Sequence, residues 1–301
     1  MKLLFTVLLL ALSAGPICAA QQTHHLARED GTVIHYTMDA PSGQSDGLLV
    51  LAQGSGCRPA ASNANLATVR AAFPAYTALI VEKSGIAPDS QIENGYEDCP
   101  PTFLDTYTLS QRIDDYGEVL AHLQSAAAPL QNILLFGGSE GGLAMEALAA
   151  RLHPTAAILL SGSVGGTFGE MVLSTVPPQG QATISAGFAQ ARANPDSTIF
   201  SGHTYRFWAD SLDHRSSDYL EATDTPFLLI YGGRDAAKPV RTLADRFAEQ
   251  GRCNFTYWEF PALDHSMVDP TGLSLMPAIA RLAASWSEWP LQSCVKTEHA
   301  E

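Results

Sequence analysis

The order of apolar and amphipathic segments is the feature that most limits how this chain can fold. Short, nearly continuous apolar runs, typical of strands buried on both faces, alternate with segments in which apolar residues recur every three or four positions, as on helices. The predicted strands are residues 47–53, 75–82, 132–136, 156–161, 226–231 and 254–260, and the predicted helices are residues 63–72, 109–124, 140–152, 240–250 and 272–287. This alternation predicts right-handed crossovers and an α/β fold, with a mostly parallel central sheet and helices on both faces.

Two segments fall outside the alternation. Residues 22–40 carry the turn Glu29-Asp30-Gly31 between two alternating stretches and predict an antiparallel hairpin. Between the strands that end near Ser161 and begin at Pro226 lie about sixty residues, far more than a crossover needs. The large side chains of this interval are Met171, Phe188, Phe200, Tyr205, Phe207 and Trp208. We therefore expect a helical cap inserted at about residues 164–225 instead of a long unstructured loop.

Residues 1–20 have the composition of a signal peptide. They combine one basic residue, Lys2, with an unbroken apolar run and a small-residue exit of the A-x-A type. The run is shorter than the roughly 20 residues that a membrane-spanning helix needs, so we expect cleavage near Ala20 and no membrane anchor. Cys18 allows a lipoprotein interpretation, but the residues just before it lack the small side chain that lipoprotein processing prefers.

The remaining residues, 21–301, are expected to form one domain, because no stretch is rich enough in proline, serine and glycine to be a linker. The formal net charge is −14 without clusters of Lys and Arg, which argues against a nucleic-acid partner. No later stretch is apolar enough to span a bilayer, and no cysteines have zinc-ligand spacing. We therefore expect a periplasmic or secreted protein with no metal, no cofactor and no stable membrane anchor after signal cleavage.

The strongest functional signal is the segment GGSEGG at residues 137–142, which joins a predicted strand directly to a predicted helix. It contains G-x-S-x-G, whose glycines allow a sharp turn that holds the serine in a strained conformation above the sheet edge. The start of the following helix favours developing negative charge at the same place. Ser139 is therefore the predicted nucleophile, and a glycine-rich turn without a nucleophile is the alternative.

A serine nucleophile needs a base to take its proton and an acid to orient that base. Asp235 lies in the turn after the strand at 226–231, and His265 follows the strand at 254–260. Both positions are carboxyl ends of strands, where an α/β sheet presents ligand-facing groups. We therefore predict Asp235 as the acid and His265 as the base.

Other residues compete for these roles. Asp264 precedes the predicted base, but adjacent residues rarely point at one another, and Asp235 has the alternative role of a helix cap. Of the other histidines, only His203 and His214 are placed to approach Ser139. Both are expected on the cap surface or in contact with substrate.

With these segments the chain resembles the α/β-hydrolase superfamily across essentially its whole mature length. The resemblance includes the YGGRD segment that ends at Asp235 and the DHS segment around His265. The GGSEGG elbow is also similar to that of the prolyl-oligopeptidase-like branch, although the propeller of those peptidases is missing. The resemblance implies an α/β-hydrolase domain over residues 21–301 and the triad order serine, acid, histidine.

The substrate carbonyl needs two hydrogen-bond donors as its oxygen becomes an oxyanion. The resemblance implies that one is the backbone N–H of Glu140 and that the other comes from the loop after the strand at 47–53. Family members commonly have His-Gly where this chain has Gln53-Gly54, and the backbone N–H of Ser55 is the predicted second donor. The Glu140 side chain is expected to be a first-turn carboxylate favoured by the helix dipole, without a chemical role.

Cysteines Cys57, Cys99, Cys253 and Cys294 remain after signal cleavage, and an even number in an exported chain predicts disulfides. Cys57 and Cys99 follow adjacent strands and are expected at the catalytic face of the sheet. Cys253 and Cys294 are expected at the opposite face. The predicted pairs are therefore Cys57–Cys99 and Cys253–Cys294. Each would close a loop of about forty residues and stabilise the folded state by about 3 to 4 kcal/mol in the chain-entropy model.

The predicted activity is that of a carboxylesterase-like serine hydrolase, which cleaves a small-molecule ester through an acyl-enzyme. An apolar cap and the lack of a peptide-gating domain favour esters. A small serine peptidase or amidase, which the elbow suggests, and a catalytically silent ligand-binding member are the alternatives. Phe207 and Trp208 are predicted to line the substrate pocket, and the alternative is that both rings belong to the core of the cap.

Overall fold

The central sheet follows the predicted alternation of strands and helices. A computed structural model describes residues 21–126, 130–162, 165–235 and 238–290, and these contain an eight-stranded sheet of order β1-β2-β4-β3-β5-β6-β9-β10. The strands are β1 (Gln22–Ala27), β2 (Val33–Asp39), β3 (Leu48–Ala52), β4 (Thr77–Val81), β5 (Ile133–Gly138), β6 (Ala156–Leu160), β9 (Phe227–Gly232) and β10 (Phe255–Phe260). The β1–β2 and β2–β4 pairs are antiparallel and the other neighbours are parallel, as the hairpin and crossovers require.

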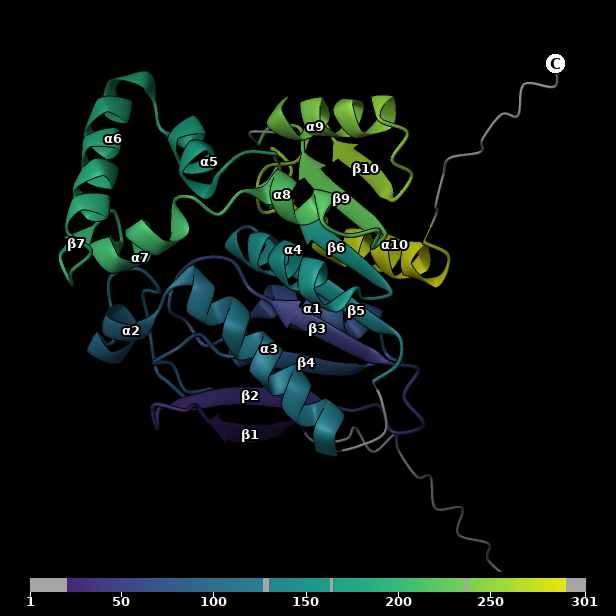
Figure 1. Cartoon of the computed structure of the whole chain (residues 1–301). Coiled ribbons are helices and arrows are strands. Elements are labelled where there is room, and N and C mark those ends of the chain that lie inside the picture. The colour runs from purple at the N-terminus through teal and green to yellow at the C-terminus, as the bar shows by residue number, and fades with distance from the viewer. Residues whose placement is uncertain (1–20, 127–129, 163–164, 236–237, 291–301) are drawn as a thin grey trace, which may run out of the picture.

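Helices cover both faces of this sheet (Figure 1). Helices α3 (Leu109–Ala126), α4 (Glu140–Leu152) and α9 (Lys238–Glu249) contribute to one apolar core, and α1 (Ala64–Ala72) and α10 (Met276–Glu288) to the other. Alternate residues of β3 enter the two cores, Leu48 and Val50 on one side and Leu49 and Leu51 on the other. This period of two explains why the buried strands are continuous apolar runs in the sequence.

The long interval after β6 folds as a helical insertion. It contains α5 (Phe168–Thr175), α6 (Pro178–Ala193), β7 (Ile199–Phe200), β8 (His203–Thr204), α7 (Tyr205–Ser211) and α8 (Ser216–Glu221). Helices α5, α6 and α7 lie together to one side of the sheet, whereas α8 packs against α4 (Figure 1). Aromatic side chains fill the interior between these helices, so the insertion is packed as the aromatic content predicts.

The predicted elements differ from the structure in two places. The helix predicted to begin at residue 272 begins at Met276, because Gly272 has a φ of +88° and Asp269 accepts hydrogen bonds from the N–H groups of Thr271 and Leu273. These contacts close a turn that a helix cannot include. The sequence analysis also missed the short helix α2 (Pro101–Thr106), whose proline at the first helical position is a known start signal.

A buried ion pair joins the amino-terminal hairpin to the body of the domain. Arg28, in the β1–β2 turn region, donates through Nε and Nη2 to the two carboxylate oxygens of Asp115 on α3, each at 2.7 Å. The side chains are 7% and 1% exposed. Removing one partner from such a pair leaves the other charge buried without compensation, which is strongly destabilising.

We therefore predict that Asp115→Ala lowers the free energy of unfolding by about 3 kcal/mol or more, as measured by urea denaturation. Asp114→Ala is the matched control, since Asp114 pairs with Arg151 on the surface, where both side chains are about half exposed. That control is expected to change stability by less than about 1 kcal/mol. Equal losses in the two variants would show that the buried pair does not fasten the hairpin.

Candidate active site

Ser139 lies at a strained turn between β5 and α4. Its φ and ψ are 52° and −124°, a conformation that side-chain-bearing residues rarely adopt, and its N–H donates to the Leu160 carbonyl at 2.9 Å. The glycines of the turn are required by close approach. A Cβ on Gly137 would lie 2.2 Å from the Gly141 carbonyl oxygen, and one on Gly141 would lie 2.4 Å from the Gln53 carbonyl oxygen. The G-x-S-x-G pattern thus forms the strand–turn–helix elbow that the sequence predicts.

His265 and Asp235 meet beyond the carboxyl ends of β10 and β9. His265 Nδ1 lies 2.8 Å from Asp235 Oδ2, and this hydrogen bond raises the pKa of His265 above its usual value. Asp264 does not compete for the imidazole, because its Oδ1 accepts the N–H groups of Ser266 and Val268 at 2.9 Å each. The geometry therefore pairs the histidine with the aspartate from the preceding strand.

Ser139 and His265 open into the same pocket. It has a volume of about 310 Å³, and its lining includes Gln53, Ser55, Asn65, Tyr96, Ser139 and His265. No hydrogen bond joins Ser139 to His265 among the described residues. In structures without substrate, the hydrogen bond between a nucleophile and its base is often long or absent. A serine and a histidine that face the same pocket can still act together on a bound substrate.

The loop after β3 runs beside Ser139. A Cβ built on Gly54 would lie 3.3 Å from Ser139 Cβ, so the loop backbone passes directly next to the serine. Within the described ranges, neither the N–H of Ser55 nor that of Glu140 has a hydrogen-bond partner. Both predicted donors are thus available to an oxygen atom at Ser139.

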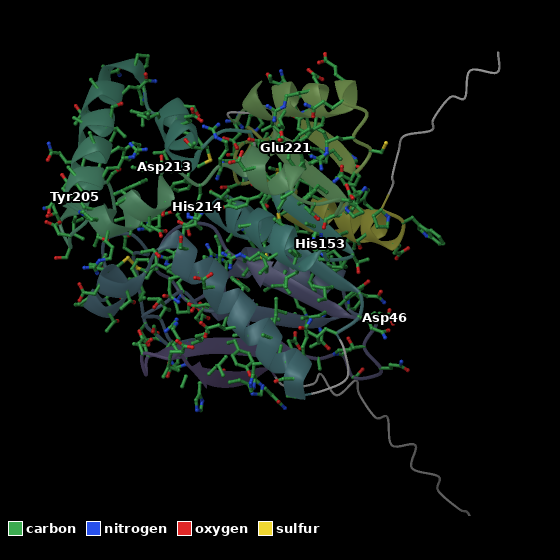
Figure 2. All side chains as sticks on the ribbon, in the orientation of Figure 1. Asp46, His153, Tyr205, Asp213, His214 and Glu221 are labelled. Carbon is green, nitrogen blue, oxygen red and sulfur yellow. A yellow bond between two sulfur atoms is a disulfide. The ribbon has the colours of Figure 1, made fainter. Side chains whose placement is uncertain are left out.

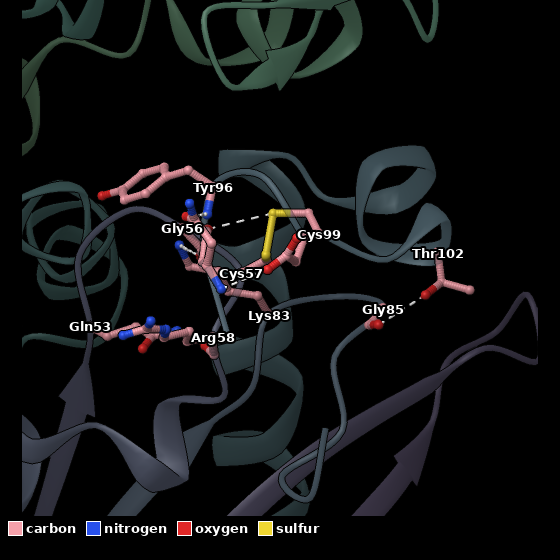
Figure 3. Close-up of a disulfide and its surroundings, with 12 residues drawn as sticks. Gln53, Gly56, Cys57, Arg58, Lys83, Gly85, Tyr96, Cys99 and Thr102 are labelled. Atoms are coloured by element: carbon pink, nitrogen blue, oxygen red, sulfur yellow. Dashed lines mark hydrogen bonds between the residues drawn. A yellow bond between two sulfur atoms is a disulfide. The ribbon is translucent and has the colours of Figure 1, made fainter. Parts of the chain in front are cut away.

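A disulfide joins Cys57, in this loop, to Cys99, as predicted (Figure 3). The two residues are 42 positions apart, and a disulfide that closes a loop of this length stabilises the folded state by about 4 kcal/mol in the chain-entropy model. Cys57 also donates its N–H to the Gly95 carbonyl at 2.8 Å, next to the pocket residue Tyr96. The second predicted pair includes Cys294, which lies outside the described residues.

Glu140 has surroundings that the sequence analysis did not predict. Its side chain is 1% exposed, and Oε1 accepts hydrogen bonds from Arg112 Nη1 at 2.8 Å and from the Tyr107 hydroxyl. The same oxygen forms an ion pair with Lys83 Nζ at 3.0 Å. Burial alone would raise the pKa of Glu140, but Lys83 and Arg112 lower it to about 2. Burial lowers the pKa of Lys83 to about 8. The signal for this cluster was a lysine directly after an apolar strand and an arginine on the buried side of a helix.

The two rival histidines lie elsewhere. His203 stacks on Phe207 with a centroid distance of 3.9 Å, and burial lowers its pKa to about 4. His214, labelled in Figure 2, joins the cap to α3. Its Nε2 lies 3.1 Å from Ser110 Oγ on α3, and its Nδ1 lies 2.6 Å from the Tyr219 hydroxyl. Neither histidine lines the pocket at Ser139.

Phe207 and Trp208 are placed in the apolar interior of the cap. They are 1% and 4% exposed, and Trp208 packs against Phe168 and Phe188 while its Nε1 donates to the Phe200 carbonyl at 2.7 Å. Neither ring lines the 310 Å³ pocket at Ser139. The geometry favours the core alternative over the pocket role predicted for both rings.

No group of His, Cys, Asp and Glu side chains within the described ranges is arranged to hold a metal ion. In the same part of the chain, no helix is long and apolar enough to cross a membrane.

The sequence matches no protein-family model, and no curated protein matches it. Solved structures nevertheless share its architecture. A thermostable carboxyl esterase from Bacillus coagulans is 13% identical, with a TM-score of 0.63 over 90% of this chain and 99% of that one. Est1E from Butyrivibrio proteoclasticus with bound ferulic acid is 15% identical, with a TM-score of 0.60 over 89% of this chain and 98% of that one.

A monoacylglycerol lipase from Paleococcus ferrophilus is also similar in structure. It is 14% identical, with a TM-score of 0.60 over 84% of this chain and 98% of that one. These likenesses, together with the sheet order, establish the α/β-hydrolase fold for this chain. The described residues contain no propeller, so the elbow similarity to prolyl-oligopeptidase-like proteins does not extend to their second domain.

The His265–Asp235 hydrogen bond predicts a pH dependence. The neutral imidazole is the form that accepts a proton, and the bond raises the pKa of His265, so the acid limb of kcat/KM should have its midpoint above pH 6.5. Asp235→Asn is expected to move this midpoint to lower pH and to lower kcat by up to about 10⁴-fold. Asp264→Asn should move the midpoint less, because Asp264 raises the pKa of His265 through its charge alone and not through a hydrogen bond. An acid limb that does not move in Asp235→Asn would contradict the pairing.

The placement of Trp208 predicts a stability effect. Trp208→Ala removes a buried ring and its hydrogen bond, and is expected to lower the free energy of unfolding by about 3 to 5 kcal/mol. Trp289→Ala, which truncates a ring that is 81% exposed, should change it by less than about 0.5 kcal/mol. An altered chain-length profile for ester hydrolysis in Trp208→Ala, with stability unchanged, would restore the pocket role.

Proposed function

We propose that this protein is a serine hydrolase that cleaves carboxylic esters, with Ser139 as nucleophile, His265 as general base and Asp235 as the orienting acid. One observation carries the proposal: a serine at a strained strand–helix elbow shares a pocket with a histidine whose far nitrogen is bonded to a carboxylate. The solved structures with this fold that are named as esterases and lipases support the same reaction class.

The proposed reaction is acyl transfer to water. Ser139 Oγ attacks the ester carbonyl while His265 Nε2 takes the hydroxyl proton, and the carbonyl oxygen becomes an oxyanion facing the N–H groups of Ser55 and Glu140. The imidazolium then protonates the leaving alcohol as the C–O bond breaks, which leaves an acyl-enzyme. Water attacks this acyl group with the histidine again as base, and the carboxylic acid leaves with Ser139 restored.

The pocket favours a small ester. Its volume of about 310 Å³ lies at the low end of the range for small-molecule sites. The Ser55 and Tyr96 hydroxyls and the Asn65 amide in its lining have no hydrogen-bond partner among the described residues. Free polar groups around a small cavity favour a short acyl or alcohol portion that itself carries hydrogen-bonding groups.

We also propose that the protein acts outside the cytoplasm. Residues 1–20 carry the signal-peptide pattern, and the Cys57–Cys99 bond belongs to an oxidising compartment.

The decisive test combines covalent labelling with a substrate screen. The wild-type protein should react with a fluorophosphonate probe and hydrolyse short aryl esters faster than long ones and faster than aminoacyl amides. Ser139→Ala should lose the label and at least about 10³-fold of the ester turnover without loss of stability, because it removes one hydroxyl and no core packing.

Ser266→Ala is the control, since Ser266 lines the same pocket but has no role in the proposed chemistry. It should still be labelled. Unchanged ester turnover in Ser139→Ala would refute the assignment of the nucleophile, whereas faster cleavage of amides than of esters would make the protein a peptidase or amidase.

A further inference from the structure

The loop after β3 is held from beneath by two buried cations. Lys83 Nζ donates to the Gly54 carbonyl at 2.8 Å and to the Gly56 carbonyl at 2.9 Å (Figure 3). Arg112 Nη2 donates to the Gln53 carbonyl at 2.6 Å. The two side chains are 1% and 2% exposed, so these bonds are shielded from water. Three carbonyls of one short loop thus point toward the same buried cluster.

Peptide planarity turns these bonds into a constraint on the N–H groups. In a trans peptide the C=O and the following N–H point in opposite directions. Holding the Gly54 carbonyl toward Lys83 therefore directs the N–H of Ser55 away from the cluster. The same stretch of loop passes next to Ser139, since a Cβ built on Gly54 would lie 3.3 Å from Ser139 Cβ. The Gly56 carbonyl provides an internal comparison, because the following N–H, that of Cys57, points outward to the Gly95 carbonyl.

The same ammonium also reaches the second expected donor. Lys83 Nζ lies 3.0 Å from Glu140 Oε1, and the backbone N–H of Glu140 starts α4 beside the nucleophile. One side chain is therefore bonded both to the peptide that orients the Ser55 N–H and to the residue that carries the other N–H. The ammonium thus donates two hydrogen bonds to loop carbonyls and forms an ion pair with the carboxylate.

We propose that Lys83 is a positioning residue that sets the spacing and direction of the two oxyanion donors, Ser55 N–H and Glu140 N–H. This inference rests on the proposed ester hydrolysis at Ser139. Lys83 contacts no substrate in this scheme, since it is buried beneath the loop. It acts through the carbonyls of Gly54 and Gly56 and through the Glu140 carboxylate.

Neutralisation of Glu140 does not by itself explain this lysine. Arg112 and the Tyr107 hydroxyl already donate to the Glu140 carboxylate. Glu82, the other buried carboxylate near both cations, accepts hydrogen bonds from the backbone N–H groups of Ala60 and Ala61. A buried ammonium is unfavourable unless its own N–H groups also have partners. The bonds of Lys83 to the carbonyls of Gly54 and Gly56 supply those partners and tie its presence to the shape of the loop.

The test uses a pair of substrates that differ in one atom. A short aryl ester and the matching thionoester, in which sulfur replaces the carbonyl oxygen, differ in how well the developing anion accepts hydrogen bonds. In Lys83→Met, kcat for the oxygen ester is expected to fall about 10² to 10³-fold, the loss seen when one oxyanion donor is removed, with little change in KM. The ratio of oxygen-ester to thionoester rates should fall by at least about tenfold, the worth of a hydrogen bond to a charged acceptor.

Tyr116→Phe is the matched control. Tyr116 is also fully buried on α3, and its hydroxyl donates to the Leu51 carbonyl of β3 at 2.7 Å, just before the loop, without touching Gly54 or Glu140. It should lose stability but keep the wild-type ratio of oxygen-ester to thionoester rates. A Lys83→Met variant that is destabilised yet retains the wild-type ratio would overturn the positioning role.

Failure of the proposed function gives a different result. If ester turnover by the wild-type protein is absent or survives Ser139→Ala, the hydrolase assignment fails before Lys83 is tested. If Lys83→Met does not fold, Lys83→Gln provides the same measurement, because a shorter, neutral amide loses the ion pair with Glu140 and cannot reach both loop carbonyls. The ratio is then expected to fall in Lys83→Gln, and an unchanged ratio would again overturn the inference.

Discussion

A carboxylate buried directly after Ser139 requires the rest of the chain to supply positive charge close to it. Desolvation opposes the ionised form of Glu140, and the adjacent Lys83 and Arg112, together with a hydrogen bond from the Tyr107 hydroxyl, stabilise that form. Lys83 comes from the segment just after β4 and Arg112 from α3, so ion pairs connect the elbow to a neighbouring strand and to a helix that covers the sheet. The position of the serine is thus fixed by buried ion pairs as well as by glycine packing.

Close backbone contact is the other constraint on the site. Because Gly141 packs against the carbonyl ends of β3, the first turn of α4 and the loop after β3 are adjacent without intervening side chains. The candidate donors therefore come from two segments, one on each side of Ser139, that are far apart in sequence. The Cys57–Cys99 disulfide fixes the same loop at Cys57, and the Lys83 hydrogen bond fixes it at the Gly54 carbonyl.

Much of this arrangement was predictable from local patterns. The alternating burial of strand residues and the strand–GGSEGG–helix junction involve residues that are close together in sequence. These patterns predicted the sheet, the elbow and the positions of Asp235 and His265 at strand ends. The environment of Glu140 was not predictable in this way, because its partners are 57 and 28 positions away, the differences 140 − 83 and 140 − 112. Phe207 and Trp208 show the same limit: aromatic content predicted a packed cap but not which rings face inward.

The charge cluster also has an evolutionary consequence. Residues 83, 112 and 140 form a set in which the effect of each substitution depends on the identity of the others, so their effects on stability are strongly epistatic. Replacing the carboxylate alone leaves two like charges buried together, and replacing one cation alone weakens the compensation of the carboxylate and frees a loop carbonyl. A descendant with a neutral residue after the nucleophile is therefore reached through less stable intermediates, or through simultaneous changes on α4, β4 and α3. The residue after the serine is therefore difficult to replace in this chain without matching changes at positions 83 and 112.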